Sequence, residues 1–247
     1  MTKQCKAKIF LAEDRGLNET LWLHRYSTFN FENYFNEDKS PPGDAYVLND
    51  DTIDGGRSLH VAVKEKSYVV LLPAVGVISY SDRSGYSSLV AAGQALIVLH
   101  EAESEFQITN PFREELVNYL QIWIRADESD GIKAFLSTYK NVNENLNELI
   151  PLFWDAKKTF SPFYSMYIAK FSGRGETVYN KKYESTEIFA YVLQGAFEVQ
   201  GRLLHARDGL ALWNGHRVEI EALADDAILL VLEQQFDVKR RRMKFLR

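Results

Sequence analysis

The sequence predicts an all-β protein built from two small antiparallel β-barrels that a short helical segment joins. Three observations support this prediction. Short runs rich in β-branched and aromatic residues recur along the chain, and Gly, Asp, Asn and Ser separate them. The two halves repeat one rough order of strands and glycine turns. The stretch between them has apolar residues close to helical spacing instead.

The length of 247 residues is enough for two small domains that each bury a core. The composition, 46% hydrophobic and 26% charged, is that of a folded globular protein rather than a disordered one. We predict four parts, with these boundaries: a first β domain at 1–126, a helical linker at 127–160, a second β domain at 161–237 and a basic tail at 238–247.

The first half contains the clearest strand pattern. Its runs are YVVLLPAVGVISY, SSLVAAGQALIVL, EFQITN and LVNYLQIWIRA, and DRSG provides a turn signal after the first of them. This pattern is typical of an antiparallel sandwich or barrel. Aromatic residues in such runs contribute much of a small barrel's core, so we expect four of them to be largely buried: Trp22, Phe29, Phe31 and Trp123.

The predicted linker differs from the strands on both sides of it. Apolar residues fall close to helical spacing, and they are Ile132, Phe135, Leu136, Leu146, Leu149 and Ile150. This spacing predicts one or two short helices within 127–160.

Glycines mark the corners that the two halves share. Gly76 and Gly93 separate strand-like runs in the first half, as Gly195 and Gly209 do in the second. Glycine adopts positive φ without steric cost, so it allows sharp chain reversals. A duplicated small β-barrel fits this repeat, although the repeat alone does not distinguish it from other all-β folds.

Charge and cysteine content exclude several functions. Six of the 29 basic residues lie in the last nine positions, so the rest of the chain holds 23 basic against 34 acidic residues. Such an acidic body repels phosphate backbones, so we expect no direct nucleic-acid binding and a solvated basic tail. The single cysteine, Cys5, excludes an intrachain disulfide and a cysteine-built zinc site. No signal peptide or membrane span is evident, which favours a cytoplasmic protein.

Common catalytic motifs are missing from the sequence. There is no glycine-rich phosphate loop, no GxSxG and no HExxH. Adjacent carboxylates such as Asp50 and Asp51 would point to opposite faces of a strand, so they do not form a catalytic pair.

Three segments resemble the pirin family of cupin proteins. They are WLHRYSTFNFENYF at 22–35, VLNDD at 47–51 and LQIWIRAD at 120–127, where the family carries WLxSxHTFSFxxYYD, VLNED and LQIWI in the same order. The resemblance covers residues 10–126, and the second half shares only the cupin pattern. It implies two cupin-type jelly-roll barrels, a bicupin, and an iron site in the first barrel formed by three histidines and one glutamate.

The family's four ligand positions can be located by counting without gaps from Asn49, Gly76 and Gly93. They fall on Ala62, Lys64, Phe106 and Ile108. None of these can act as an imidazole or carboxylate ligand, so the resemblance predicts a barrel whose metal site is lost. We expect all four side chains to line the interior of the first barrel. Lys64 could then hold an anion there, or the interior could simply be filled with core side chains.

Other histidines provide no second ligand at metal spacing. His60 stands alone on its strand, and His100 with Glu101 fits the family's HSE only after a six-residue shift. In the second half the cupin positions read Asn180, Lys181, Lys182 and Tyr183, followed by the isolated His205 and His216. We expect structural or solvated roles for these histidines.

The sequence therefore predicts a pirin-related bicupin without a metal cofactor, which binds a small molecule or a protein partner without catalysis. The first alternative is a pirin-type quercetin 2,3-dioxygenase, which the resemblance implies. The second is a transcription cofactor that acts through a protein partner. Neither the ligand, the partner nor the oligomeric state follows from the sequence.

Overall fold

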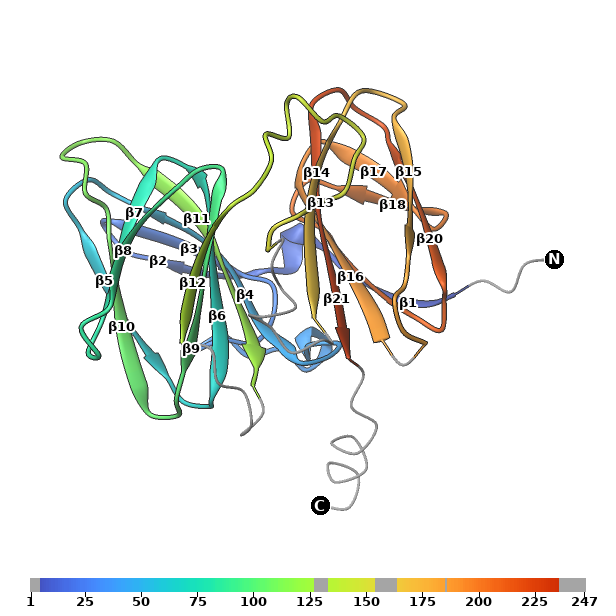
Figure 1. Ribbon diagram of the computed structural model, residues 1–247. Coiled ribbons are helices and arrows are strands. Elements are labelled where there is room, and N and C mark those ends of the chain that lie inside the picture. Colours follow the sequence, from blue (N-terminus) through green and yellow to red (C-terminus); the bar gives the residue numbers. More distant parts are fainter. Residues whose placement is uncertain (1–4, 127–132, 154–163, 185, 236–247) are drawn as a thin grey trace, which may run out of the picture.

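The computed structural model describes residues 5–126, 133–153, 164–184 and 186–235. Two β-barrels lie side by side, each formed by a large sheet and a four-stranded sheet (Figure 1). Nearly all the regular structure is strand, apart from the 3-10 turns η1 (Ala12–Asp14) and η2 (Glu37–Lys39). The prediction of an all-β, two-barrel protein is confirmed.

The first barrel pairs a seven-stranded sheet with a four-stranded one. In spatial order the large sheet is β12 (Ala134–Thr138), β9 (Gln94–His100), β6 (Ser67–Val75), β11 (Val117–Arg125), β4 (Ala45–Ile53), β3 (Leu23–Ser27) and β2 (Gly16–Glu19). The small sheet is β5 (Ser58–Val63), β10 (Ser104–Thr109), β7 (Val77–Asp82) and β8 (Ser87–Ala91).

The second barrel has the same plan with one strand fewer in its large sheet. That sheet is β1 (Lys6–Phe10), β19 (Gly209–Trp213), β16 (Thr186–Gln194), β21 (Ala227–Gln235), β14 (Ser165–Phe171) and β13 (Ile150–Pro151). The four-stranded sheet is β15 (Glu176–Asn180), β20 (Arg217–Ala222), β17 (Ala196–Val199) and β18 (Arg202–His205). Every pairing between these strands is antiparallel.

The N-terminal strand belongs to the second barrel. β1 pairs with β19, so that Lys6 lies opposite Trp213 and Phe10 opposite Gly209. The chain then crosses to the first barrel, which begins with β2. The predicted first domain at 1–126 therefore contains one strand that completes the sheet of the other barrel, an exchange that no local pattern in the sequence indicates.

The prediction of a helical linker is wrong for the part of the linker that the structure describes. Residues 133–153 contain β12, which pairs with β9 in the first barrel, and β13, which pairs with β14 in the second. Turns connect them: Asn141 Oδ1 accepts hydrogen bonds from the backbone N–H and the side chain of Asn143. Asparagine side chains that bond the nearby backbone compete with helix formation. Residues 127–132 and 154–160 of the predicted linker lie outside the described residues, as does the basic tail at 238–247.

Two of the predicted corner glycines occupy equivalent turns in the two barrels. Gly76 lies between β6 and β7 with φ of 81°, and Gly195 lies between β16 and β17 with φ of 80°. Both are in the left-handed region that favours glycine. Gly209 differs, because it lies within β19, where a Cβ atom would come within 2.6 Å of the Phe189 ring.

Three apolar clusters form the core. One fills the first barrel, one fills the second, and the third lies between the two large sheets. In the third cluster the ring of Phe10 packs edge-on against Phe29 at 5.2 Å and against Phe189 at 5.9 Å. Because these rings come from β1, from the chain after β3 and from β16, the interface joins both barrels and the N-terminal strand.

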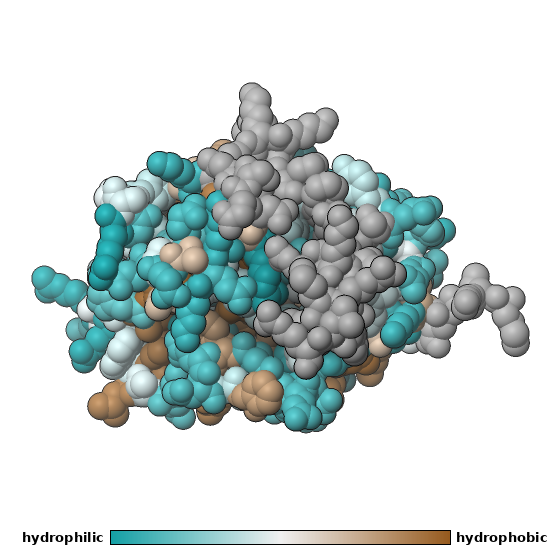
Figure 2. Space-filling model, turned by 90° about the horizontal axis from the view of Figure 1, so that it is seen from below, coloured by the Kyte–Doolittle hydropathy of each residue, from teal (hydrophilic) through white to brown (hydrophobic). Residues whose placement is uncertain are grey.

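The expectation that four aromatic residues are largely buried is met by two of them. Phe29 and Trp123 are buried, whereas Trp22 and Phe31 are only partly buried against the core of the first barrel. The face shown in Figure 2 is mostly hydrophilic, with hydrophobic residues interspersed. Among the described residues, no helix has the length and apolarity needed to cross a membrane.

Candidate functional site

The four predicted ligand positions do not share one environment. Phe106 and Ile108 on β10 are buried in the first barrel, with exposed fractions of 2% and 0%. Ala62 and Lys64 are exposed. The prediction that all four line the barrel is therefore wrong for Ala62 and Lys64, and with it the idea that Lys64 holds an anion inside the barrel.

The pairing of β5 with β10 explains this difference. Val61 lies opposite Phe106, while Ala62 lies opposite the partly exposed Glu105. Val61 and Val63 are buried, so β5 turns its valines inward and its alternate residues outward. The two positions that counting selects on β5 therefore lie on its outward face. On a strand, a shift of one residue moves a side chain to the opposite face.

Aromatic side chains fill the interior around Phe106. Its ring stacks on Tyr80 at 5.7 Å and packs at an angle against His100 at 5.0 Å and Trp123 at 6.0 Å. All four side chains are buried. This part of the barrel is a packed core. It matches the expectation of an interior filled with core side chains.

His100 is held in place by hydrogen bonds. Its Nε2 lies 2.9 Å from the Tyr80 hydroxyl, which donates to Asp82, and its Nδ1 lies 3.2 Å from Ser104 Oγ. Burial lowers the pKa of His100 to about 4, although the negative charge of Asp82 offsets part of this effect. The imidazole is therefore neutral near pH 7 and serves to pack and position its neighbours.

The remaining alternative ligands are dispersed. His60, His205 and His216 are exposed, and Glu101 forms a surface ion pair with Lys66. Within the part of the chain that the structure describes, no three histidine, cysteine, aspartate or glutamate side chains come together. These donors do not fit a metal held by three histidines and one glutamate.

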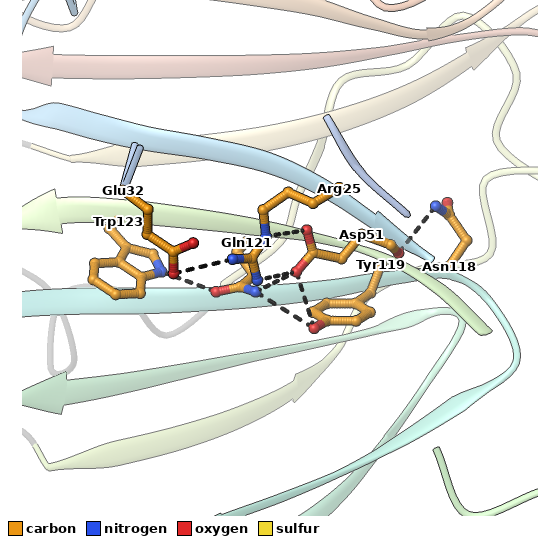
Figure 3. Close-up of polar contacts among 7 residues, drawn as sticks. All are labelled: Arg25, Glu32, Asp51, Asn118, Tyr119, Gln121 and Trp123. Carbon is orange, nitrogen blue, oxygen red and sulfur yellow. Dashed lines mark hydrogen bonds and ion pairs between the residues drawn. The ribbon is translucent and has the colours of Figure 1, made fainter. Parts of the chain in front are cut away.

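A buried ion pair lies on the inner wall of the first barrel. The guanidinium of Arg25 on β3 donates from Nε to Asp51 Oδ1 and from Nη2 to Asp51 Oδ2, both at 2.8 Å (Figure 3). Arg25 is 2% exposed and Asp51 is 0% exposed. Such a two-pronged contact satisfies both carboxylate oxygens with a fixed geometry.

Three residues of β11 surround this pair. The Tyr119 hydroxyl and Gln121 Nε2 both donate to Asp51 Oδ2, and the indole Nε1 of Trp123 donates to Gln121 Oε1 (Figure 3). The strands explain the arrangement, because Arg25, Asp51 and Tyr119 lie directly opposite one another on β3, β4 and β11. We call Arg25, Asp51, Tyr119 and Gln121 the inner-wall network.

The inner-wall network shifts the pKa of its members. Burial acts to lower the pKa of Arg25, but the hydrogen bond and charge of Asp51 outweigh it and hold that pKa above its ordinary value. Burial, reinforced by the charge of Asp51, raises the pKa of the Tyr119 phenol. The arginine is therefore charged and the tyrosine neutral across the physiological range.

A pocket of about 400 Å³ opens over this network. Its lining comes from β2, β3 and the loop at 31–34, and it includes Arg25 and Ser27. The Phe31 ring covers the guanidinium at 5.0 Å, and Glu32 Oε1 lies 3.4 Å from Arg25 Nη1. The pocket thus reaches Arg25, while the other three residues of the inner-wall network do not line it.

The inner-wall network is not among the sites that the sequence predicts. A signal was present, because Arg25 stands where the motif WLxSxHTFSF has serine, on the same face as Leu23 and Ser27. In the sequence, Asp51 is one of two adjacent carboxylates. Its side chain does point away from that of Asp50, which contacts Arg15 and Arg207 instead of Arg25.

Comparisons with known proteins identify the class. A family model described as "Quercetinase C-terminal cupin domain" matches residues 163–233. The chain is 23% identical over 220 residues to a quercetin 2,3-dioxygenase of Escherichia coli K12, which covers 89% of this chain and 95% of that protein.

Solved structures show the same fold. YhhW from Escherichia coli matches with a TM-score of 0.82 and 21% identity, covering 94% of this chain and 98% of that one. A structure of the same bacterial pirin in complex with nickel(II) matches with a TM-score of 0.80 and 20% identity, over 94% of this chain and 100% of that one.

Two jelly-roll barrels with this connectivity define a bicupin. The family match and the relatives indicate the same group of bicupins as the motifs in the first half of the sequence. The chain therefore has the bicupin fold, and it is similar to the pirin-related cupin proteins in that fold and in the sequence of its second barrel.

Proposed function

We propose that this chain is a pirin-related bicupin that has lost its family's metal site and acts by binding a small molecule or a protein partner without catalysis. The proposal includes a cytoplasmic location and the absence of a metal cofactor. It also includes the absence of direct DNA binding, since the body of the chain is acidic.

The inner-wall network is the observation that carries this proposal. Asp51, the buried carboxylate of this wall, accepts hydrogen bonds from Arg25, Tyr119 and Gln121 on its two oxygens. A metal ion at Asp51 would have to displace a cation that is already bound there, at a large cost in electrostatic energy. On the opposite wall Val61, Phe106 and Ile108 offer no ligand atoms.

The alternative is a pirin-type quercetin 2,3-dioxygenase. The name of the Escherichia coli relative favours this activity, and the nickel complex of the bacterial pirin favours a metal site in such proteins. The donors in this chain disfavour it. Metal-dependent cleavage of a flavonol by oxygen needs open coordination positions on a bound metal, and three of the four positions named from the family pattern carry hydrocarbon side chains.

The second alternative is a transcription cofactor, a role that the resemblance to pirins implies. Six of the 29 basic residues lie in the last nine positions, and the remainder of the chain holds 23 basic against 34 acidic residues. A role of this kind would therefore depend on contacts with a protein rather than with the phosphate backbone of DNA.

A reconstitution assay tests the proposal against the dioxygenase alternative. The purified protein is incubated without oxygen with Fe²⁺, Ni²⁺ or Mn²⁺, desalted, and mixed with quercetin in air while the flavonol absorbance is followed. We expect no metal-dependent loss of absorbance. The Escherichia coli quercetin 2,3-dioxygenase, treated in the same way, serves as the positive control. Turnover that depends on added metal and stops with a chelator would overturn the proposal.

A further inference from the structure

A buried serine in the wall of the pocket over Arg25 has no hydrogen-bond partner. Ser27 is 3% exposed and lines that pocket, and its hydroxyl bonds to no other group among the described residues. Nearly all buried polar side chains in proteins are paired with protein groups or with water. Because this hydroxyl lines a pocket of about 400 Å³, it is available to a molecule inside the pocket.

Glu32 supplies an incompletely bonded carboxylate at the same pocket. Its side chain is 48% exposed, and its Oε1 lies 3.4 Å from Arg25 Nη1 (Figure 3). Hydrogen bonds between an arginine and a carboxylate are normally about 2.7–2.9 Å long, so this contact is a weak one. Glu32 has no other side-chain partner among the described residues. Its carboxylate can therefore accept hydrogen bonds from a ligand.

The charges at the pocket favour a cation. Arg25 is the only basic residue among the described residues that line it, and Asp51 holds that guanidinium through two bonds of 2.8 Å. Glu32 and Glu19 also line the pocket, which leaves two carboxylates in excess. Glu19 pairs at 3.2 Å with the exposed His24 on the outer side of the sheet, so it acts from farther away than Glu32. Together they attract a positively charged ligand and repel an anion.

Two aromatic rings stand beside these polar groups. The backbones of Phe31 and Tyr34 bond each other twice, at 3.1 and 2.9 Å, which fixes both residues at the base of one tight turn. The Tyr34 ring lies over Gly16, which is directly opposite Ser27 on the neighbouring strand. The Phe31 ring covers the Arg25 guanidinium at 5.0 Å. Aromatic rings attract cations and also pack against apolar groups, so they suit a cation that carries a ring.

We propose that this pocket binds a small organic cation of the amidine, guanidine or primary-amine class, which donates hydrogen bonds to Glu32 and Ser27. The apolar part of the ligand lies beside Phe31 and Tyr34, and the buried ion pair stays intact. This inference deepens the proposed function, and it rests on that function in taking the chain to act by binding a small molecule.

Three probes of matched size test the ligand class: benzamidine, benzamide and benzoate. They share one ring and are cationic, neutral and anionic at pH 7. Binding to isotopically labelled full-length protein is followed by NMR, through the backbone amides of β2, β3 and residues 31–34. We expect benzamidine to bind roughly tenfold more tightly than benzamide, because a hydrogen bond between charged groups is the stronger one, and benzoate to bind weakest. Equal affinities for benzamidine and benzamide would contradict the inference.

The positions of the shifted amides test the location of the site. The second barrel carries another acidic groove, formed by β15, β17 and β20 and lined by glutamates that include Glu176, Glu219 and Glu221. We expect the shifts in β2, β3 and residues 31–34 to saturate at the lowest benzamidine concentration. Shifts that saturate first in β15 and β20 would place the cation in the other groove and overturn the inference.

Glu32→Gln is the decisive variant, and Glu37→Gln is its matched control. Both remove one exposed carboxylate, but Glu37 lies in η2 and does not line the pocket. We expect Glu32→Gln to weaken benzamidine binding roughly tenfold and to leave benzamide binding unchanged. Glu37→Gln should leave both affinities unchanged. A wild-type preference for benzamidine in Glu32→Gln, or an equal loss in both variants, would overturn the inference.

Ser27→Ala tests the hydroxyl, with Ser137→Ala as its control. Ser137 is also buried with an unpartnered hydroxyl, but it lies on β12 at the opposite edge of the large sheet from β2. We expect Ser27→Ala to weaken benzamidine binding roughly fivefold, the effect of one hydrogen bond, and Ser137→Ala to leave it unchanged. Thermal unfolding without ligand should give wild-type midpoints for both. Ser27→Ala also carries the test if Glu32→Gln does not fold, and unchanged affinity in it would contradict the inference.

Metal content, measured on the same samples, separates this inference from the proposed function. Stoichiometric metal would overturn the proposed function, while the benzamidine result in Glu32→Gln would still decide the ligand class of the pocket. Metal-free protein that binds no benzamidine would overturn the inference and leave the proposed function standing.

Discussion

Arg25 and Asp51 are an unusual pair of residues for the inside of a β-barrel. Two opposite charges that are almost without exposure must compensate each other, since neither can be solvated. Tyr119 and Gln121 saturate the carboxylate further. The inner wall of the first barrel is therefore polar and closed, and it differs in kind from a wall of histidine ligands.

Removing one charge of this pair should destabilise the fold strongly. We expect Arg25→Met to lower the free energy of unfolding by about 3–5 kcal/mol, because it leaves Asp51 buried without its cation. Chemical denaturation measures the change. Arg174→Met is the matched control: Arg174 pairs with Glu221 but is largely exposed, so its loss should change stability by less than about 1 kcal/mol. A change in the free energy of unfolding as small as that of the control would contradict the prediction, because it would mean that water solvates the charge of Arg25.

His100 should make stability depend on pH. Burial lowers its pKa in the folded protein to about 4, against about 6.5 in an unfolded chain. Between these values the unfolded chain binds a proton that the folded protein does not. The stabilisation is therefore present above pH 6.5 and is lost at about 1.4 kcal/mol per pH unit as the pH falls toward 4.

Denaturation at several pH values between 4 and 7 tests this prediction. His100→Phe retains an aromatic ring beside Phe106 and Tyr80 and should flatten the profile in that window. His60→Gln, at an exposed histidine, is the control and should leave the profile of the wild type. A slope that is the same in His100→Phe and in the wild type would refute the role of His100.

At the scale of elements, sequence patterns predicted most strands but not their partners. The alternation of Leu59, Val61 and Val63 indicates the inward face of β5 better than motif counting does, and it contradicts the count that selected Ala62 and Lys64. Side-chain burial fixed the phase of the strand. Counting from Asn49 and from Gly76 selects the same positions on either side of β5, so the burial of its valines and not the spacing of the motifs shows which face of the strand points inward.

Other features depended on contacts that are distant in sequence. The pairing of β1 with β19 joins residues about 200 positions apart, and the Arg25–Asp51 contact becomes visible only when β3 and β4 are paired in register. Helical spacing at Phe135 and Leu136 was misleading because β12 pairs along the edge of the first barrel, where partial burial does not enforce strict alternation.

Strand β1 should contribute to stability through Phe10. We expect Phe10→Ala to cost about 3–5 kcal/mol, since it opens a cavity between Phe29 and Phe189. Amide hydrogen exchange should also accelerate in β19, which would lose the support of its edge neighbour. The adjacent Leu11 is 41% exposed, so Leu11→Ala provides a control with little expected effect. Equal effects of the two variants would contradict this role of β1.

On the scale of the whole molecule, the two barrels form one structure. The third apolar cluster takes residues from both large sheets, and polar contacts cross the same interface. Arg15 and Arg207 both contact Asp50 of β4, and Ala45 N–H donates to Gln234 of β21 at 2.7 Å. Neither barrel could expose this face without exposing apolar surface to water.

The barrels should therefore unfold together. We expect one transition in calorimetry, with a calorimetric enthalpy that matches the van't Hoff value. Fluorescence and circular dichroism should report the same midpoint. Phe10→Ala weakens the interface, so it is the variant in which the two barrels are most expected to unfold in separate transitions. Two resolved transitions in the wild type would show that the interface adds little stability.

Metal analysis of the purified protein tests the proposed loss of the metal site most directly. Mass spectrometry of the elements should find far less than one equivalent of iron, nickel, copper, manganese or zinc per chain. The Escherichia coli quercetin 2,3-dioxygenase, prepared alongside, shows whether the purification itself removes metal. One equivalent of any of these metals, retained through purification and released with loss of activity by a chelator, would contradict the account.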